Sequence, residues 1–205
     1  LVAAHIGLAI MIAPLLGEGQ SDAGEIERSI GMHKIDPHVR MRYQVEAMKY
    51  LQQSDVWTNL FFVWAGTGTI ENNLRAVIDR LGVSKHVRFL GYREDITSLL
   101  DASDMFILPS HFEGMPLSIT EAMAKGLPVI ATSVSGIPEQ LGDTGKLLTD
   151  PSINRQNTIK ELEITVENWA CNKKLRNDIG KACKQRAKKM FKAKKMLKEY
   201  IEVIE

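Results

Sequence analysis

Cysteine is scarce in this chain of 205 residues, which contains two. Cys171 and Cys183 both fall in a segment of helical periodicity, so they indicate neither a disulfide framework nor a metal-ligand pair. No metal-ligand spacing connects four of the histidines either, His5, His33, His38 and His86. The sequence therefore predicts no bound metal, and it is typical of a protein from a reducing compartment such as the cytoplasm.

A long apolar run is also missing. A helix that spans a bilayer needs about 20 apolar residues, whereas residues 1–16 are interrupted by Gly7 and Pro14. This stretch lacks the basic start of a signal peptide, and residues 17–24 have the composition of a linker. We therefore expect residues 1–29 to be a linker or the remnant of a preceding region, and residues 30–205 to form one domain.

The sequence lacks a complete dinucleotide fingerprint. Gly66-Thr67-Gly68 follows an apolar segment, but Glu71 occupies the position of the third glycine. A nucleotide-sugar epimerase would also need a Tyr-x-x-x-Lys pair, which neither Tyr43 nor Tyr92 provides. These absences argue against a nicotinamide-dependent enzyme.

Short apolar runs alternate with segments of helical period along most of the chain. The expected strands are residues 30–34, 60–65, 87–90, 105–108, 129–132 and 146–148, and the expected helices are residues 42–53, 70–81, 96–102, 117–125, 137–141 and 156–205. This order predicts the α/β class, a Rossmann-like parallel sheet with helices on both faces, followed by C-terminal helices. Ligands bind beyond the carboxyl ends of such strands. We therefore expect one edge to gather the residues that follow strands, Gly66, Gly91, Ser110 and Glu113.

The most informative segment joins a loop to a helix and reads Glu113-Gly114-Met115-Pro116-Leu117-Ser118-Ile119-Thr120-Glu121. The start of a helix offers unpaired backbone N–H groups and the positive end of the helix dipole, which suit a phosphate. Pro116 suits the first helical position, where its missing N–H is not needed. The two flanking carboxylates suit the hydroxyl groups of a sugar and of a ribose. The segment therefore predicts a site for a nucleotide-sugar.

Residues 113–132 follow the frame Glu-Gly-x-Pro-Leu-x-x-x-Glu-Ala-Met-Ala-x-Gly-Leu-Pro-Val-Ile-Ala-Thr, which resembles the donor-binding motif of retaining glycosyltransferases of family four. The resemblance runs from about Ile30 to the C-terminus and includes residues 62–68, 87–93 and 102–110. It implies the C-terminal donor-binding domain of a GT-B fold, whose last helices cross to an N-terminal domain that holds the acceptor. It also implies a UDP- or GDP-sugar as donor, transfer with retention, no cofactor or metal, and a role in polysaccharide biosynthesis.

The resemblance assigns roles to individual residues. Glu121 would bind the ribose hydroxyls and Glu113 the hydroxyls of the transferred sugar, while backbone N–H groups of Gly114, Met115 and Leu117 would bind the diphosphate. The other positions that would line the donor pocket are Gly66, Gly68, Gly91, Tyr92 and Ser110. For some of them a purely structural role stays open: residues 66–68 as a tight turn, and Tyr92 as an exposed aromatic. His111 is expected to be a solvated loop residue, with contact to the donor as the alternative.

The chain departs from the family where two cations would neutralise the leaving diphosphate. Many members carry Arg and then Pro-x-Lys-Gly, whereas here Lys34 takes the arginine position, Val39 the lysine position and Arg40 the glycine position. We expect Lys34 and Arg40, or Arg42, to supply the charge. If they do not reach the diphosphate, the protein is slow or inactive. An active hexosyltransferase and a non-catalytic nucleotide-sugar-binding module therefore both stay open.

Charge is distributed unevenly along the chain. The net charge is +1, but residues 173–198 hold twelve Lys or Arg against one acid, Asp178. A solvated helix face is the first interpretation of this run. Peripheral contact with anionic lipid at the inner membrane face is the second, because many members of the resembled family act on lipid-linked acceptors. No nucleic-acid partner is expected, because aromatic residues are not interleaved with the basic ones.

Overall fold

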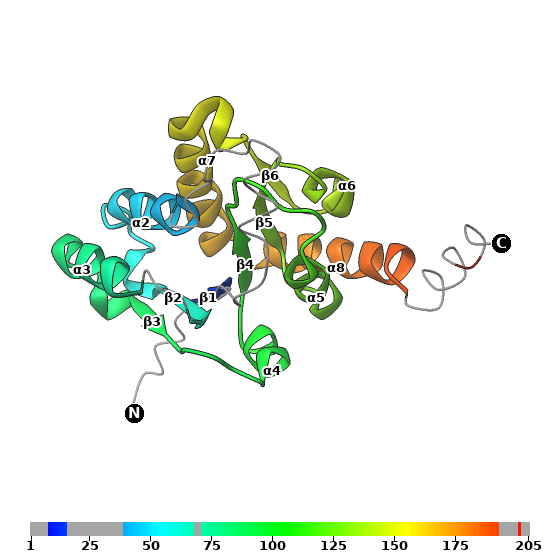
Figure 1. Cartoon of the computed structure of the whole chain (residues 1–205), viewed down its shortest axis with the longest axis horizontal. Helices are drawn as coiled ribbons and strands as arrows, with labels where there is room; N and C mark the ends of the chain where they lie inside the picture. The colour runs from blue at the N-terminus through cyan, green and yellow to red at the C-terminus, as the bar shows by residue number, and fades with distance from the viewer. Residues whose placement is uncertain (1–7, 16–38, 68–70, 193–200, 202–205) are drawn as a thin grey trace, which may run out of the picture.

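The computed structural model of the chain describes residues 8–15, 39–67, 71–192 and 201. These residues form a parallel sheet of six strands in the order β3-β2-β1-β4-β5-β6 (Figure 1). The strands are β1 (Leu8–Leu15), β2 (Leu60–Gly66), β3 (Val87–Phe89), β4 (Met105–Leu108), β5 (Val129–Thr132) and β6 (Lys146–Leu148). The α/β class and the parallel sheet predicted from the sequence are confirmed.

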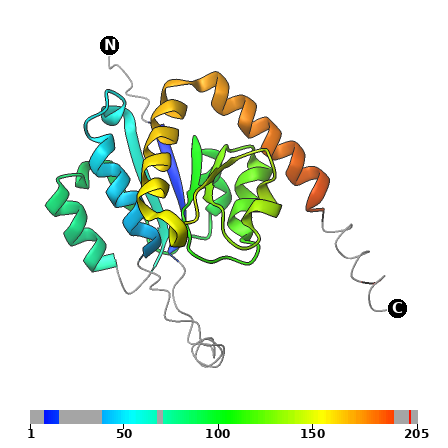
Figure 2. The ribbon, with the colours of Figure 1, turned by 90° about the horizontal axis from the view of Figure 1, so that it is seen from above.

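Helices cover both faces of the sheet. They are α2 (Val39–Leu51), α3 (Glu71–Leu81), α4 (Ile96–Asp101), α5 (Leu117–Lys125), α6 (Ile137–Leu141), α7 (Pro151–Cys171) and α8 (Lys173–Met190), with short 3₁₀ turns η1 (Trp57–Asn59) and η2 (Ser84–His86). Side chains of α2, α3 and α7 share one core, and those of α4, α5, α6 and α8 share the other. Figure 2 shows α2, α3 and α7 on one side of the strands and α5 and α8 on the other.

The central strands contribute to both cores by simple alternation. In β4, Met105 and Ile107 belong to the core beneath α2 and α7, whereas Phe106 and Leu108 belong to the core beneath α5. All four side chains are buried. This explains why β4 reads as a continuous apolar run, since a strand covered on both faces has no polar side.

Strand β1 corrects the expectation that residues 1–29 lie outside the domain. It pairs with β2 and β4, so that Ile10 lies beside both Phe62 and Met105. A short apolar run is equally the signature of a central parallel strand, and the register shifts between Ile12 and Leu15, where a proline is tolerated. The prediction was therefore wrong for residues 8–15, and the other residues of 1–29 lie outside the described ranges.

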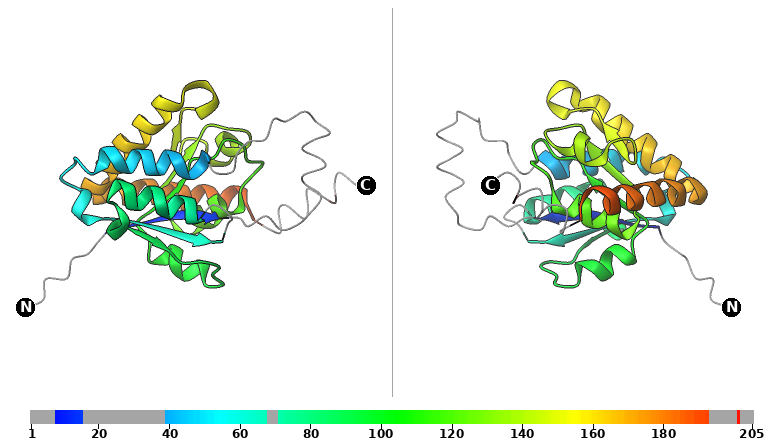
Figure 3. Two further views of the ribbon diagram at one scale, coloured as in Figure 1. Left: turned by 60° about the vertical axis from the view of Figure 1, so that its left-hand side comes forward. Right: turned by 90° about the vertical axis from the view of Figure 1, so that its right-hand side faces the viewer.

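The C-terminal region forms two helices where one helical segment was expected. Helix α7 opens with a short turn after Asp150, whose Oδ1 accepts a hydrogen bond of 2.8 Å from the backbone N of Ser152, and it kinks at Asn154, where φ is −153° and ψ is 90°. The long part of α7 starts after this kink, next to the predicted residue 156. Asn172 separates the helices, and its Oδ1 accepts a hydrogen bond of 2.9 Å from the N of Leu175, which caps α8. Figure 3 shows α8 in orange, next to α5. The predicted strand 30–34 lies outside the described residues.

Candidate functional site

The carboxyl ends of the strands share one edge of the sheet, because all six strands are parallel. The expectation that residues following the strands gather at this edge is confirmed for the loops after β2, β3 and β4. Gly66 N, at the end of β2, donates a hydrogen bond of 2.6 Å to Gly91 O, after β3. Both glycines have positive φ angles, 115° and 65°, which side-chain-bearing residues rarely adopt. The chain order reverses at β1, between β2 and β4, and ligands bind beside such a point in α/β sheets.

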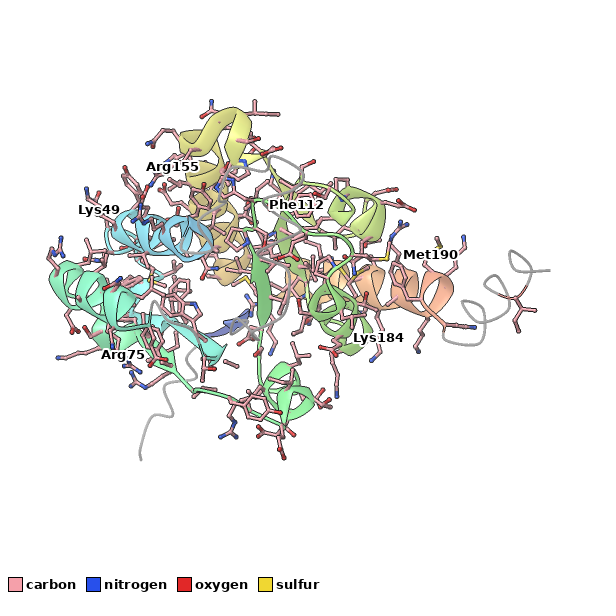
Figure 4. All side chains as sticks on the ribbon, in the orientation of Figure 1. Lys49, Arg75, Phe112, Arg155, Lys184 and Met190 are labelled. Atoms are coloured by element: carbon pink, nitrogen blue, oxygen red, sulfur yellow. The ribbon has the colours of Figure 1, made fainter. Side chains whose placement is uncertain are left out.

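The loop after β4 holds Glu113 by its own side chains and by β5. Ser110 is fully buried, and its Oγ donates a hydrogen bond of 2.7 Å to Oε1 of Glu113. The carbonyl oxygen of Ser110 accepts a hydrogen bond of 2.6 Å from Oγ1 of Thr132, at the end of β5. Ser110, which follows β4 and is held by Thr132 of β5, thus orients the carboxylate of the half-buried Glu113. Figure 4 labels Phe112 in the same loop.

Helix α5 starts directly after this loop. Pro116 is its N-cap, with φ −64° and ψ 120°, so the prediction that Pro116 would be the first helical residue was wrong by one position. The extended ψ angle places its ring before the helix. Leu117 opens the helix with 76% of its surface exposed, and Glu121 follows one turn later, also exposed. Leu117 and Glu121 therefore lie on a solvent-accessible part of α5, whereas Ile119 between them is fully buried.

A second loop, between β5 and α6, supports the first. Gly136 N donates a long hydrogen bond of 3.4 Å to Glu113 O. A Cβ atom added to Gly136 would lie 2.1 Å from Gly114 O, so only glycine allows the two loops to approach this closely. In α6, Gln140 Nε2 donates hydrogen bonds to Pro116 O (2.9 Å) and to Thr120 Oγ1 (2.7 Å). Our sequence analysis identified neither supporting residue, although a glycine before a helix is a recognisable turn signal.

His111 was expected to be solvated, and this is wrong. It is half-buried, and its Nε2 is hydrogen-bonded to the Tyr43 hydroxyl of α2. The Arg155 guanidinium lies 5.7 Å from the Tyr43 ring centroid and forms an ion pair with Glu46. Figure 4 shows Arg155 in this region. Burial raises the pKa of Tyr43, and the positive charge of Arg155 opposes that rise. The hydrogen bond between His111 and Tyr43 ties the loop after β4 to α2.

The turn after β3 is held by a local ion pair. Arg93 donates hydrogen bonds of 2.7 and 2.6 Å to the two carboxylate oxygens of Asp95, and the hydrogen bond from Arg93 lowers the pKa of that carboxyl. Tyr92 beside it is 75% exposed. Its stacking on a base stays a prediction.

Some predicted site residues lie outside the described part of the chain. They are Lys34 and Gly68, and the side chain of Arg40, whose backbone belongs to the first turn of α2 together with Val39. Met115 is described and about half exposed, at 48%. The binding roles assigned to all these residues stay predictions. The described residues contain no group of three or more His, Cys, Asp or Glu that could hold a metal ion.

Comparison with known proteins gives matches in both sequence and structure. The family model described as Glycosyl transferases group 1 matches residues 27–186. The UDP-Gal:alpha-D-GlcNAc-diphosphoundecaprenol alpha-1,3-galactosyltransferase of Escherichia coli is 39% identical over 101 residues, which cover 49% of this chain and 26% of that protein. The matched region is thus about a quarter of that relative's length.

Two solved structures show the same fold. HepE from Anabaena, in complex with UDP and glucose, superposes with a TM-score of 0.72 at 20% identity, covering 97% of this chain and 48% of that one. The C-terminal domain of a glycosyl transferase group 1 family protein from Francisella tularensis superposes with a TM-score of 0.67 at 20% identity, covering 91% of this chain and 87% of that domain. The expected fold of a C-terminal GT-B domain is confirmed.

Proposed function

This chain belongs to the glycosyl transferases group 1 family, and from that membership we propose that it supplies the donor-binding half of a retaining hexosyltransferase. One observation carries the proposal: the carboxylates of Glu113 and Glu121 flank the exposed start of α5, at the sheet edge where α/β proteins bind ligands. A phosphate between two polyols matches this order of groups. The donor is a UDP- or GDP-sugar, a choice supported by the UDP-galactose in the relative's name and by the UDP bound in HepE.

In the proposed reaction the bond between the anomeric carbon of the sugar and the diphosphate oxygen breaks, an acceptor hydroxyl oxygen bonds to that carbon, and the hydroxyl proton passes to the leaving diphosphate. Negative charge develops on the leaving diphosphate, so fixed donors and cations near it lower the barrier. First-turn N–H groups of α5 supply the donors, and Lys34 and Arg40 supply the cations. Glu113 orients the sugar, with Ser110 holding its carboxylate. The acceptor binds to a separate N-terminal domain. We assign the reaction to polysaccharide biosynthesis.

A non-catalytic nucleotide-sugar-binding module is the second candidate. The uncharged Val39 at the start of α2 favours it, because this is the position of the family's lysine. Both candidates bind nucleotide, so turnover by a protein that also carries an N-terminal GT-B domain separates them. Transfer of sugar would reject the module.

Replacement of Glu121 tests the proposed donor site. A panel of UDP- and GDP-sugars screened by thermal shift identifies the nucleotide, and calorimetry then measures its affinity. Glu121→Ala should weaken binding at least about tenfold, because two charge-assisted hydrogen bonds to the ribose are lost. Asp143→Ala, which removes another exposed carboxylate, is the control and should bind normally. Equal affinity in the Glu121 variant would contradict the assignment.

A further inference from the structure

Gln140 is a buried polar residue at the base of the candidate site. Its side chain is fully buried, and it comes from α6, on the far side of the β5–α6 loop. Pro116 O is an acceptor only, so the amide nitrogen of Gln140 must be the atom that faces it. The same nitrogen donates to Thr120 Oγ1, one turn further along α5. Gln140 therefore bonds to both ends of the first turn of α5.

The other atom of the same amide is left unpaired. Among the described residues, Gln140 Oε1 is a buried side-chain oxygen without a hydrogen-bond partner. Such an oxygen destabilises a fold, and an apolar side chain of the same length would avoid the penalty. Methionine or leucine at this position would not leave an unpaired oxygen, but neither could donate a hydrogen bond. The two hydrogen bonds that Gln140 donates are therefore its advantage over these residues.

The first turn of α5 needs support of this kind. Its N-cap is Pro116, which has no polar side-chain atom to bond to the N–H groups of the turn. Ile119 N donates a hydrogen bond of 3.1 Å to Pro116 O, so the N–H groups of Leu117 and Ser118 are the ones left for an anion. The usual side-chain cap that fixes a helix start is missing. Gln140 holds the turn from its carbonyl side instead, where it competes with no anion.

Helix α6 is itself held in place by α8. The Arg186 guanidinium donates hydrogen bonds from Nε to Gln140 O (2.9 Å) and from Nη2 to Glu139 O (2.6 Å). A Cβ atom added to Gly142 would lie 2.7 Å from the same guanidinium, so Gly142 leaves room for it. α6 has five residues, and these hydrogen bonds hold its last turn against α8, which has eighteen residues.

We propose that Gln140, anchored by Arg186, is a positioning residue that aims the first-turn N–H groups of α5 at the terminal phosphate of the donor's diphosphate. The proposal rests on the proposed function, because it presumes that a diphosphate binds there. It names a role for α6 and α8 in donor binding without contact to the donor. The proposal predicts that replacing Gln140 reduces the contribution of the terminal phosphate to nucleotide affinity.

The experiment measures the ratio of affinities for UDP and UMP, or for GDP and GMP, by calorimetry on the 205-residue chain. Gln140→Met keeps the length and burial of the side chain and removes its donors. The ratio should fall by about fivefold, the equivalent of about one hydrogen bond. Gln185→Met, the same change at an exposed position of α8, is the matched control and should keep the ratio. Thermal melting of each variant reports the structural effect separately.

Thr120→Val is the second variant, and it serves if Gln140→Met does not fold. It removes the hydroxyl that accepts from Gln140 while keeping the shape of the side chain, and it should lower the same ratio. A lower melting temperature with an unchanged ratio in the variant that folds would overturn the inference and leave Gln140 with a structural role only. If the unaltered chain binds neither diphosphate, the proposed function fails, and the inference fails with it.

Discussion

The two cysteines show how burial sets chemical behaviour at the residue scale. Cys171 is exposed at the end of α7, whereas Cys183 of α8 is buried in the core beneath α5. Burial raises the pKa of the Cys183 thiol, whose Sγ donates a hydrogen bond of 3.0 Å to Thr144 O. Since the thiolate is the reactive form, a raised pKa and a buried sulfur both slow its reactions. Both cysteines lie on helices, as the sequence predicts, and of the two only Cys183 is part of a hydrophobic core.

A thiol reagent should therefore distinguish them. In the folded chain one thiol, Cys171, should react quickly, and the second should react only after denaturation. Raising the pH to about 9 should still leave Cys183 slow in the folded chain, because its pKa lies above its ordinary value there. Cys171→Ser, which removes the fast phase, identifies the thiols. Rapid reaction of two thiols in the folded chain would contradict the burial of Cys183.

The residues around the candidate site differ in how far the sequence alone could reveal them. Glu113, Pro116 and Glu121 lie within one short segment, so their spacing alone predicted a carboxylate on each side of a helix start. The residues that hold this segment come from elsewhere: Tyr43 lies 68 positions before His111, and Gln140 lies 20 positions after Thr120. Such contacts depend on how α2 and α6 pack, which no local pattern specifies.

At the scale of elements, α5 and α8 cross at two glycines. A Cβ atom added to Gly180 of α8 would lie 2.0 Å from Gly126 O, at the end of α5. Gly126 has a φ of 87° and ends α5 in the left-handed conformation. The crossing is therefore too close for a larger residue on α8, and it fixes where α8 lies on the sheet.

Gly180→Ala should reverse the usual effect of this substitution. In an exposed helix the change stabilises by about 1 kcal/mol, but here the methyl group meets backbone, and overpacking of this kind costs about 1–3 kcal/mol. Urea denaturation should show a net loss of stability. Asn177→Ala, at an exposed position of α8, is the control and should not destabilise the chain. Greater stability in the Gly180 variant would show that the helices cross less closely.

The prediction of helices and strands succeeded where the sequence pattern fitted one kind of element and failed where it fitted two. Strands β4, β5 and β6 and helices α5 and α6 have the predicted bounds, because each apolar run or helical period ends at a turn residue. Strand β1 was missed because its apolar run also suits a linker remnant. The break at Asn172 was missed because asparagine does not interrupt a helical period as proline does.

On the scale of the whole molecule, the basic residues of α8 divide into two groups. Arg176 and Arg186 turn inward and donate to backbone carbonyls of α7 and α6. The outward group comprises Lys173, Lys174, Lys181, Lys184, Lys188 and Lys189, all exposed (Figure 4 labels Lys184). No helix in the described ranges is long and apolar enough to cross a membrane. The exposed lysines can therefore either form a solvated helix face or contact an anionic surface.

Vesicle binding tests the second possibility. Vesicles with anionic lipid should retain the chain at low salt and release it at high salt, since each cation near the surface contributes about 1 kcal/mol and salt screens it. Lys181→Glu with Lys188→Glu should weaken retention, whereas neutral vesicles should retain neither protein. Equal binding to neutral and anionic vesicles, or to neither, would leave only the solvated face.

Strand β1 has a consequence for how the chain tolerates being shortened. It is paired on both edges, with β2 on one side and β4 on the other. A version of the chain without residues 8–15 would keep β2–β3 and β4–β5–β6 as two separate half-sheets. Each half would carry a new edge of unpaired N–H and C=O groups, and such edges pair with other chains. Removal of this one strand would therefore replace the fully paired centre of the sheet with two exposed edges that promote self-association.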